Sequence, residues 1–280
     1  MPYITTVITG ATSGIGRETA LALAKKDHAV YMLVRDVKKG ELLRDEITGI
    51  TKNSHVYVIE CDLADMQSIN SAANTLKSGL MAINVLINNA GGIFAQRQES
   101  KDGVELTLAV NHLGHFLLVQ NLLPLLERGQ ARVINISSEA HRMGKPNFRD
   151  IQSTIAYSAF KAYAMSKLFN IYFARSLAIK YGPKGISSFA LHPGVVNTSF
   201  GADLKGLGKI LLWFMRPFML SAEQGAQTSV YLATAPRIDA KSGNYFKNKH
   251  VVNPANIATK EKARDKLWDI SMEMVGPFLQ

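Results

Sequence analysis

The 280-residue sequence predicts an α/β fold: a doubly wound parallel sheet of seven strands with helices on both faces. Short apolar runs recur along the chain, amphipathic stretches separate them, and this alternation continues almost from end to end. No linker rich in Pro, Ser or Gly and no internal repeat interrupts it. We therefore expect a single domain over residues 1–280.

Each apolar run is short and rich in β-branched residues, as buried strands of a parallel sheet are. Right-handed crossovers through the intervening helices would bring these runs side by side. The expected strands are residues 4–9, 29–34, 55–60, 85–88, 132–137, 186–191 and 243–246.

Helical spacing of apolar residues is clearest over 106–126 and 162–180. A further helix is expected after Pro254, where it would pack either on the domain or on a second subunit. The alternation breaks between Val196 and Ser221, where glycines punctuate a segment rich in large apolar side chains. We interpret residues 196–221 as a substrate-binding lid. An ordinary amphipathic helix, or contact with a membrane surface through the lysines beside it, are the alternatives.

Composition excludes several classes of protein. Hydrophobic residues make up 47% of the chain and charged residues 19%, which is typical of a folded core. The single cysteine, Cys61, allows no intrachain disulfide and is expected to be a buried structural thiol. The sequence begins without the pattern of a secretory signal, and no apolar run is long enough to span a membrane, so we expect a cytoplasmic protein. The net charge of +10 is scattered, which favours an anionic cofactor over nucleic acid.

A glycine-rich turn, TGATSGIG, follows the first expected strand and opens a helix. Glycines permit a tight turn and a close approach of the backbone, and the start of the helix attracts a pyrophosphate. The position directly after a strand makes this turn much stronger support for a dinucleotide than the glycines alone. The residues expected to contact the phosphates are Gly10, Thr12, Ser13, Gly14, Ile15 and Gly16.

The tip of the second strand distinguishes NADP from NAD, because an arginine there attracts a 2′-phosphate and a carboxylate holds a free ribose. Arg35 occupies the tip and Asp36 follows it. Since adjacent side chains of a strand point to opposite faces, only one of them faces the cofactor. We predict NADP(H), bound by Arg35 with possible support from Arg17.

Three motifs together resemble the short-chain dehydrogenase/reductase family: the turn above, Cys61-Asp62-Leu63, and Asn88-Asn89-Ala90-Gly91 at the end of the fourth strand. The segments VRDVKKGE, VNHLGHF and AYAMSKL are similar to the NADP-dependent branch of retinol dehydrogenases and protochlorophyllide reductases. The resemblance implies a Rossmann fold, with Asp62 at the adenine, Leu63 offering backbone contacts, and Asn89, Ala90 and Gly91 beside the adenosine.

Two Tyr-x-x-x-Lys pairs compete for the catalytic role, Tyr157 with Lys161 and Tyr163 with Lys167. On a helix each pair would share one face. The second pair contains Ser166 and precedes His192-Pro193-Gly194 at about the family's distance, so we assign Tyr163 and Lys167 to the reaction. Tyr157 and Lys161 are expected near the start of the helix, where Tyr157 could still line the pocket.

A phenol with a pKa near 10 exchanges protons poorly at neutral pH unless a cation lies beside it. We expect Lys167 to supply that cation and, as the resemblance implies, to bind the ribose of the cofactor. The hydroxyls of Ser137 and Ser138 are expected to point to different faces, and the resemblance favours Ser138 as the one that contacts the substrate oxygen. The resemblance adds Asn111 as a fourth catalytic residue in a water-linked proton relay, Thr198 at the nicotinamide carboxamide, and Pro193 and Gly194 in the nearby turn.

The histidines show no metal-ligand spacing, so no metal is expected, and no G-x-S-x-G motif points to a serine hydrolase. The sequence therefore predicts an NADP(H)-dependent enzyme that interconverts a carbonyl and an alcohol, with a lipophilic small molecule as its substrate. A non-catalytic sensor of NADP(H) is the alternative, and an extended-type epimerase or dehydratase would need different glycine spacing. A monomer and a homodimer both fit the sequence.

Overall fold

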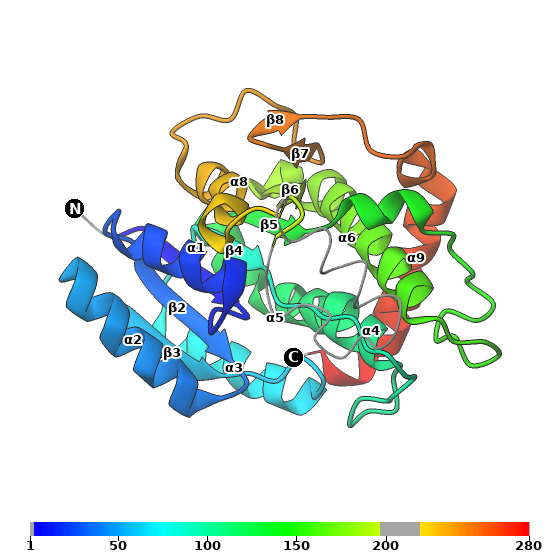
Figure 1. Cartoon of the computed structure of the whole chain (residues 1–280), viewed down its shortest axis with the longest axis horizontal. Coiled ribbons are helices and arrows are strands. Elements are labelled where there is room, and N and C mark those ends of the chain that lie inside the picture. Colours follow the sequence, from blue (N-terminus) through cyan, green and yellow to red (C-terminus); the bar gives the residue numbers. More distant parts are fainter. Residues whose placement is uncertain (1–2, 197–218, 280) are drawn as a thin grey trace.

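One continuous sheet lies at the centre of the computed structural model, which describes residues 3–196 and 219–279 (Figure 1). Its strands are ordered β3-β2-β1-β4-β5-β6-β7-β8. The order reverses direction at β1, so β1 and β4 flank the switch point where open α/β sheets bind ligands. The strands are β1 (Thr5–Thr9), β2 (Ala29–Val34), β3 (Val56–Glu60), β4 (Val85–Asn88), β5 (Arg132–Ile136), β6 (Ser187–His192), β7 (Tyr245–Lys247) and β8 (His250–Val251).

The α/β fold and the seven expected strands are confirmed, but the expected strand count was one too low. The additional strand, β8, has two exposed residues and pairs antiparallel with β7, whereas β1 to β7 pair in parallel. Two exposed residues leave no apolar run in the sequence, so periodicity could not reveal this strand.

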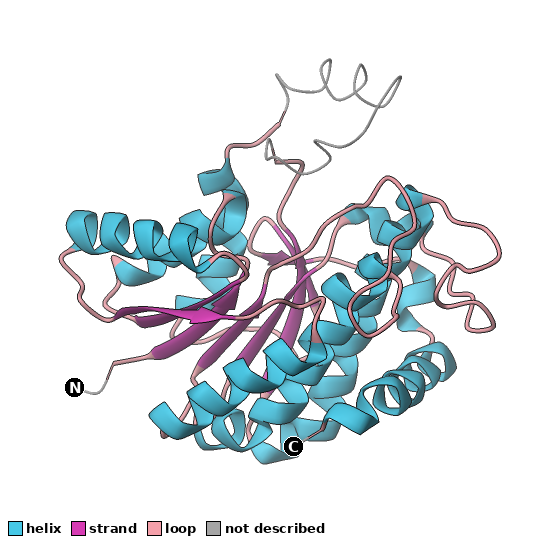
Figure 2. Cartoon of the chain, turned by 90° about the horizontal axis from the view of Figure 1, so that it is seen from below, coloured by secondary structure: helices cyan, strands magenta, loops and turns pink. Residues whose placement is uncertain are grey.

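Helices cover both faces of the sheet (Figure 2). Helices α1 (Gly14–Ala24), α2 (Val37–Thr51) and α8 (Ala222–Thr234) lie on one face. The other face carries α3 (Met66–Gly79), α5 (Gly114–Arg128) and α6 (Ala159–Tyr181), and α9 (Glu261–Val275) packs against α6. The helix expected after Pro254 is thus α9, and it packs on the same chain.

Two apolar cores result from the alternation of side chains along each strand. Val7 and Leu86 are fully buried among α3, α5 and α6, whereas their neighbours Ile8 and Ile87 are buried beneath α1, α2 and α8. Strands covered in this way must be apolar on both faces, which explains the continuous runs in the sequence. The sheet is therefore a rigid base for residues at its carboxyl edge.

The expected helix over 106–126 is interrupted. It consists of a short α4 (Leu106–Leu108), a π-helical turn η1 (Ala109–Leu113) and then α5. By length and composition the stretch Leu106–Arg128 could span a membrane, but 78% of its most apolar window is buried inside the protein, as in the core helix of a folded domain. The π turn carries Asn111, and such turns are frequent at functional sites.

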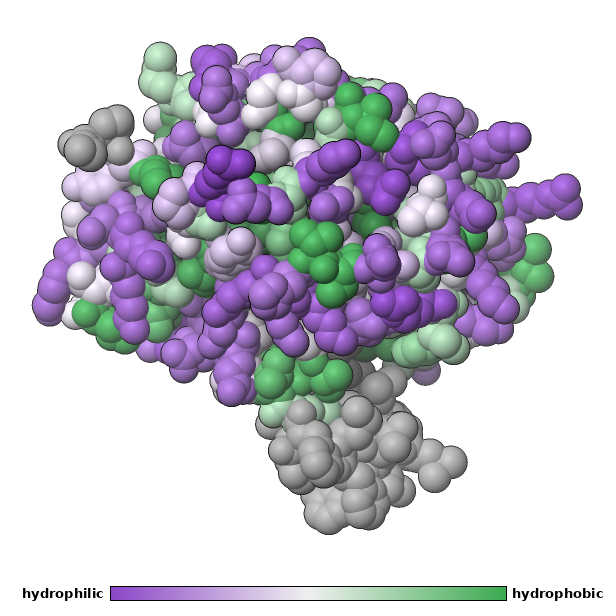
Figure 3. All heavy atoms as spheres, turned by 90° about the horizontal axis from the view of Figure 1, so that it is seen from above, coloured by the Kyte–Doolittle hydropathy of each residue, from purple (hydrophilic) through white to green (hydrophobic). Residues whose placement is uncertain are grey.

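Hydrophilic side chains are spread over the face of the molecule shown in Figure 3, between small hydrophobic areas. No broad hydrophobic face is visible among the described residues on that side.

Candidate active site

A groove of about 930 Å³ runs along the carboxyl ends of the strands. Nearly all of the residues expected at the site line this groove, although they come from separate parts of the chain. They are Gly10, Thr12, Ser13, Gly14, Ile15, Gly16, Arg35, Asp62, Leu63, Asn89, Ala90, Gly91, Ser138, Tyr163, Lys167, Pro193 and Gly194. Asn111 lies buried beside the groove, and Thr198 lies outside the described residues, as does residue range 197–218 of the expected lid.

The glycine-rich turn leaves one end of the groove open to a ligand. Gly10 and Gly14 have φ angles of +65° and +52°, which glycine adopts without strain. A Cβ atom on Gly16 would lie 2.2 Å from the carbonyl oxygen of Gly10, so only glycine fits where α1 meets the turn. Ser13, at the N-cap of α1, makes no side-chain capping hydrogen bond. The N–H groups of the first turn are thus available to an anion, and this end fits a pyrophosphate.

Asn89 braces the same turn from β4. Its side-chain amide donates to the carbonyl oxygens of Thr9 at 2.9 Å and Gly10 at 3.1 Å. The hydroxyl of Thr9 accepts the backbone N–H groups of Asn89 and Ala90, both at 3.0 Å, and lies 2.9 Å from Nε2 of His115. Asn89 therefore lines the groove and also holds two of its loops together.

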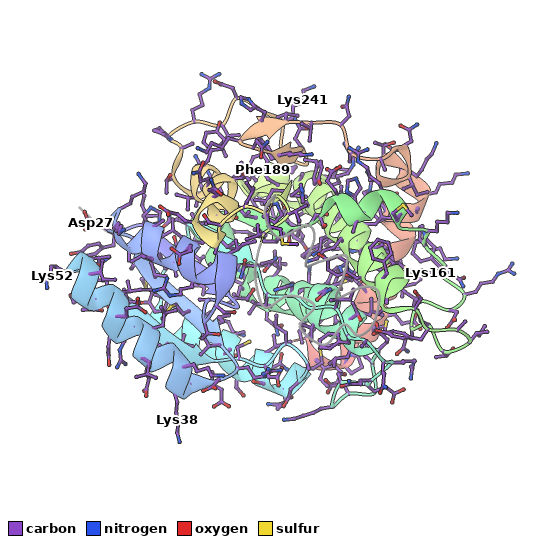
Figure 4. All side chains as sticks on the ribbon, in the orientation of Figure 1. Asp27, Lys38, Lys52, Lys161, Phe189 and Lys241 are labelled. Carbon is purple, nitrogen blue, oxygen red and sulfur yellow. The ribbon has the colours of Figure 1, made fainter. Side chains whose placement is uncertain are left out.

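At the tip of β2 the two candidate side chains are used differently. The carboxylate of Asp36 caps α2 by accepting the N–H of Lys39 at 3.1 Å, and it lies 3.4 Å from the Lys39 ammonium. These contacts hold the pKa of Asp36 below its usual range, the backbone hydrogen bond contributing most. Arg35, Lys38 and Lys39 all line this end of the groove, together with the acidic residues Asp36 and Glu60. Lys38 extends outward from α2 in Figure 4.

Arg17 does not support this end of the groove, contrary to the sequence-based expectation. Its guanidinium forms ion pairs with Glu18 and Glu46, and the residue is not part of the groove lining. Glu18 and Glu46 therefore neutralise the charge of Arg17, which the sequence suggested as support for the cofactor.

The Cys61-Asp62-Leu63 segment, which follows β3, closes the side of the groove. The carboxylate of Asp62 accepts the N–H of Ala64 at 2.9 Å, and the N–H of Asp62 donates to Ser68 Oγ at 3.0 Å. Burial raises the pKa of the Cys61 thiol to about 12, so this cysteine is an unreactive packing residue.

Ser138, Tyr163 and Lys167 meet at the other end of the groove. Tyr163 and Lys167 lie one turn apart on α6, and Ser138 follows β5. Ser138 and Tyr163 are joined by a side-chain hydrogen bond. The Lys167 ammonium donates to the carbonyl oxygen of Ile136 at 3.1 Å and lies 5.5 Å from the centroid of the Tyr163 ring. A hydroxyl, a phenol and an ammonium thus share one wall.

Burial dominates the protonation of Tyr163 and Lys167. It raises the pKa of Tyr163 to about 12, although the hydrogen bond with Ser138 opposes the shift. Burial also lowers the pKa of Lys167 to about 8. With its pKa raised in this way, the phenol carries its proton at neutral pH.

Gly91 brings the backbone close to this wall. A Cβ atom at this position would lie 3.1 Å from Oδ1 of Asn111 and 3.2 Å from the ammonium nitrogen of Lys167. Asn111 in turn accepts the N–H of Gly92 at 2.8 Å and donates to its carbonyl oxygen at 2.9 Å and to Ser166 Oγ at 2.9 Å. Asn111 therefore connects the loop after β4 to the helix that carries Tyr163.

The alternatives weighed from the sequence are Ser137, which also lines the groove, and the pair Tyr157 and Lys161, which does not. The hydroxyl of Ser137 donates to the backbone oxygen of Lys167 at 2.7 Å and is buried against α6. Tyr157 donates its hydroxyl hydrogen to the carbonyl oxygen of Phe94 at 2.7 Å and is not part of the groove lining. Lys161 is exposed in the first turn of α6, at the outer edge of the molecule in Figure 4.

Pro193 and Gly194 follow β6 at the mouth of the groove. Gly194 has a φ angle of +96°, and a Cβ atom there would lie 2.4 Å from Leu220 Cδ1. Beyond this turn, Val196 pairs with Leu220 in a parallel bridge, and the N–H of Leu220 donates to the carbonyl oxygen of Val195 at 2.7 Å. The two ends of the expected lid are therefore joined beside the groove.

Sequence reasoning did not single out several residues of the groove. Lys38 and Lys39 stood within the quoted VRDVKKGE segment, so their signal was present but not assigned to the cofactor. The apolar side chains of Phe94, Leu106 and Val110 gave no signal, because they reach the groove from loops and a helix end. Within residues 3–196 and 219–279 no group of three or more His, Cys, Asp or Glu side chains is placed to hold a metal ion.

Comparison with known families decides the class of this fold. The family described as short chain dehydrogenase matches residues 5–206, which include the glycine-rich turn and Tyr163 with Lys167. The chain belongs to the short-chain dehydrogenase family. As a short-chain dehydrogenase it is an oxidoreductase that acts on alcohol and carbonyl groups with a nicotinamide cofactor.

Among curated relatives, human retinol dehydrogenase 12 is 42% identical over 278 residues, covering 99% of this chain and 87% of its own length. Human retinol dehydrogenase 11 is 38% identical over 277 residues, with the same coverage of 99% and 87%. A solved structure of an uncharacterized protein from Mycobacterium paratuberculosis is 30% identical with a TM-score of 0.79, covering 99% of this chain and 96% of that chain. This short-chain dehydrogenase therefore resembles the retinol dehydrogenase branch along nearly its whole length.

Proposed function

We propose that this short-chain dehydrogenase uses NADP(H) to interconvert a lipophilic aldehyde or ketone and the corresponding alcohol. The observation that carries the proposal is the meeting of Ser138, Tyr163 and Lys167 on one wall of the groove whose other end fits a dinucleotide. The hydride itself is supplied by the nicotinamide ring when the cofactor is bound. The chain contributes binding, orientation and proton transfer.

Three side chains have distinct roles in this proposal. The Ser138 hydroxyl donates to the carbonyl oxygen of the substrate, where negative charge develops during reduction. Tyr163 holds its proton at neutral pH and delivers it from the phenol oxygen to the same substrate oxygen. Lys167, as an ammonium, stabilises the resulting tyrosinate and has further N–H groups for a ribose, since its contact with Ile136 uses only one.

The choice of NADP over NAD is supported by the charges at the tip of β2. Arg35, Lys38 and Lys39 surround that end of the groove, while Asp36 is engaged as the cap of α2. A 2′-phosphate would meet three cations there.

A lipophilic substrate is supported by the groove wall near Tyr163. Phe94, Leu106 and Val110 line the groove there, and the Phe94 ring lies close over Gly92. The relatives named retinol dehydrogenase suggest retinoids among the compounds to test. Cytoplasmic location and the choice between monomer and homodimer stay predictions from the sequence.

The test is absorbance-monitored oxidation of NADPH, with NADH in parallel, against all-trans-retinaldehyde, decanal and small polar carbonyls. We expect NADPH to be preferred and a lipophilic carbonyl to be reduced. Tyr163→Phe should lower kcat by about 100-fold or more while the Kd of NADPH, measured by fluorescence, stays within about twofold. Tight NADPH binding by the unaltered protein without turnover of any carbonyl would instead favour a sensor of the cofactor.

A further inference from the structure

Two hydrogen bonds from one residue fix the backbone of Ser138. The carbonyl oxygen of Ser138 accepts the backbone N–H of His141 at 3.0 Å, and it lies 2.6 Å from Nδ1 of the same histidine. His141 belongs to the 3₁₀ turn η2 (Glu139–Met143), which begins directly after the serine. The ring and the main chain of His141 therefore hold one oxygen of Ser138 together.

The partner on the opposite side of the ring fixes which nitrogen carries the proton. The N–H of Ala255 lies 3.0 Å from Nε2 of His141. Because a backbone N–H can only donate, Nε2 must accept, and the proton of the neutral ring is on Nδ1. Burial lowers the pKa of His141, which keeps the ring neutral. Nδ1 is thus the donor to Ser138.

The surroundings hold the ring in place. His141 is fully buried, and its ring packs edge-on against Tyr245 with a centroid distance of 5.0 Å. Next to it, Arg142 donates to the carbonyl oxygen of Asn253 at 3.1 Å. The turn η2 is therefore attached by two consecutive side chains to the segment that precedes η5 (Asn256–Thr259).

We propose that His141 is a positioning residue for Ser138, acting through the serine backbone. This inference rests on the proposed role of Ser138 and adds a residue that the motifs do not assign. The serine side chain has two contacts to preserve, the hydrogen bond with Tyr163 and the N–H of Ala140, which donates to Ser138 Oγ at 3.2 Å. A rotation of the Ser138 backbone would move the hydroxyl away from both. The ring of His141 prevents that rotation.

Two substitutions, His141→Asn and His141→Gln, test the two ring nitrogens separately. In His141→Asn the short amide takes the place of Nδ1 and can still donate to Ser138. In His141→Gln the longer amide takes the place of Nε2 and can accept from Ala255 but does not reach Ser138. We expect His141→Gln to lose about tenfold or more in kcat with KM for NADPH within about twofold, and His141→Asn to keep kcat within about threefold.

His28→Gln is the matched control. His28 is also a buried histidine with a ring hydrogen bond, 2.8 Å from Thr6 Oγ1, but it precedes β2 at the end of the sheet away from the groove. We expect this variant to keep the kcat of the unaltered protein. Loss of kcat by all three variants, equal loss by the two His141 variants, or no loss by His141→Gln would overturn the proposal.

A second measurement does not depend on turnover. The amide hydrogen exchange of Ala140 reports the hydrogen bond to Ser138 Oγ, and NMR can follow it in the protein without substrate. We expect exchange to accelerate about tenfold or more in His141→Gln and to stay unchanged in His141→Asn and His28→Gln. Unchanged exchange in His141→Gln would refute the positioning role even if no carbonyl substrate were found, so the two proposals fail separately.

Discussion

Arg35 and Asp36 are adjacent in sequence but serve different parts of the molecule. Arg35 and Asp36 both line the groove, but the Asp36 carboxylate also accepts the N–H of Lys39 and caps α2. The proposed function assigns Arg35 to the cofactor, whereas the hydrogen bond of Asp36 stabilises a helix. The same separation can be measured, because cofactor preference and stability are independent quantities.

Arg35→Ala should lower the preference for NADPH over NADH by about tenfold or more, because one of three cations near the 2′-phosphate is removed. Asp36→Ala should leave the preference unchanged and reduce the free energy of unfolding by about 1 kcal/mol, the usual cost of a lost N-cap. The checks are the ratio of kcat/KM values for the two cofactors and urea unfolding. A shift of preference toward NADPH in Asp36→Ala would mean that this carboxylate does act on the ribose.

For single residues, the sequence was informative at positions where the chemistry requires a particular residue type. The glycines of the turn could be located from their position between a strand and a helix, and Tyr163 with Lys167 from the resemblance to the family, because two Tyr-x-x-x-Lys pairs share the same spacing. The surroundings of a side chain were harder to predict from the sequence. Neither the ion pair of Arg17 with Glu46 nor the burial that raises the pKa of Tyr163 leaves a mark in the local sequence, since both depend on distant neighbours.

Two loops, residues 92–105 and 144–158, form a connected element beside the groove. Tyr157 donates to the carbonyl oxygen of Phe94, and Arg97 donates to the carbonyl oxygen of Gln152 at 3.2 Å. The side chain of Gln152 also accepts the N–H of Glu105 at 3.1 Å. Three hydrogen bonds between the two loops therefore support the wall that presents Phe94.

Tyr157→Phe should loosen this wall, because the Phe94 carbonyl loses its partner. We expect kcat/KM for a bulky lipophilic carbonyl to fall by about fivefold to tenfold, while the value for a small carbonyl changes by less than about twofold. Tyr181→Phe is a matched control, since the Tyr181 hydroxyl donates to the Gln120 side chain at the far end of α6. Equal losses for large and small substrates would argue against a role in the wall.

Elements were predictable where burial is periodic. The seven runs and the final helix follow from alternation and from helical spacing. The break at the π turn η1 was missed because the apolar pattern continues through Ala109–Leu113, and a one-residue change of hydrogen bonding does not disturb it. Loops 92–105 and 144–158 were also missed as a pair, because no local pattern links them.

The whole molecule buries several neutral histidines, which couples its stability to pH. Burial lowers the pKa of His112 and of His115 to about 3, and that of His192 to about 4. In the unfolded chain these rings take up protons near pH 6.5, whereas the folded protein resists protonation. The unfolded state therefore binds more protons over this interval, and the free energy of unfolding falls as the pH falls.

We expect stability to decrease steadily from about pH 6.5 toward pH 4, with the steepest loss near the lower end. His112→Gln should flatten this dependence, because one buried ring no longer titrates. His250→Gln, at an exposed position on β8, should leave the slope unchanged. Urea unfolding at a series of pH values measures the slope. The same slope in all three proteins would contradict the assignment to buried histidines.

The bridge between Val196 and Leu220 has a consequence for engineering. It fixes both ends of residues 197–218 at neighbouring points, and the contact of Leu220 with Val195 reinforces it. When the scaffold already closes a loop, the entropy of closure depends only weakly on loop length. A segment from another member of the family, longer or shorter, can then be grafted between these two residues. Because residues 196–221 are predicted from the sequence to form the substrate-binding lid, we expect such an exchange to alter substrate preference while the sheet and the proton-transfer residues stay as they are.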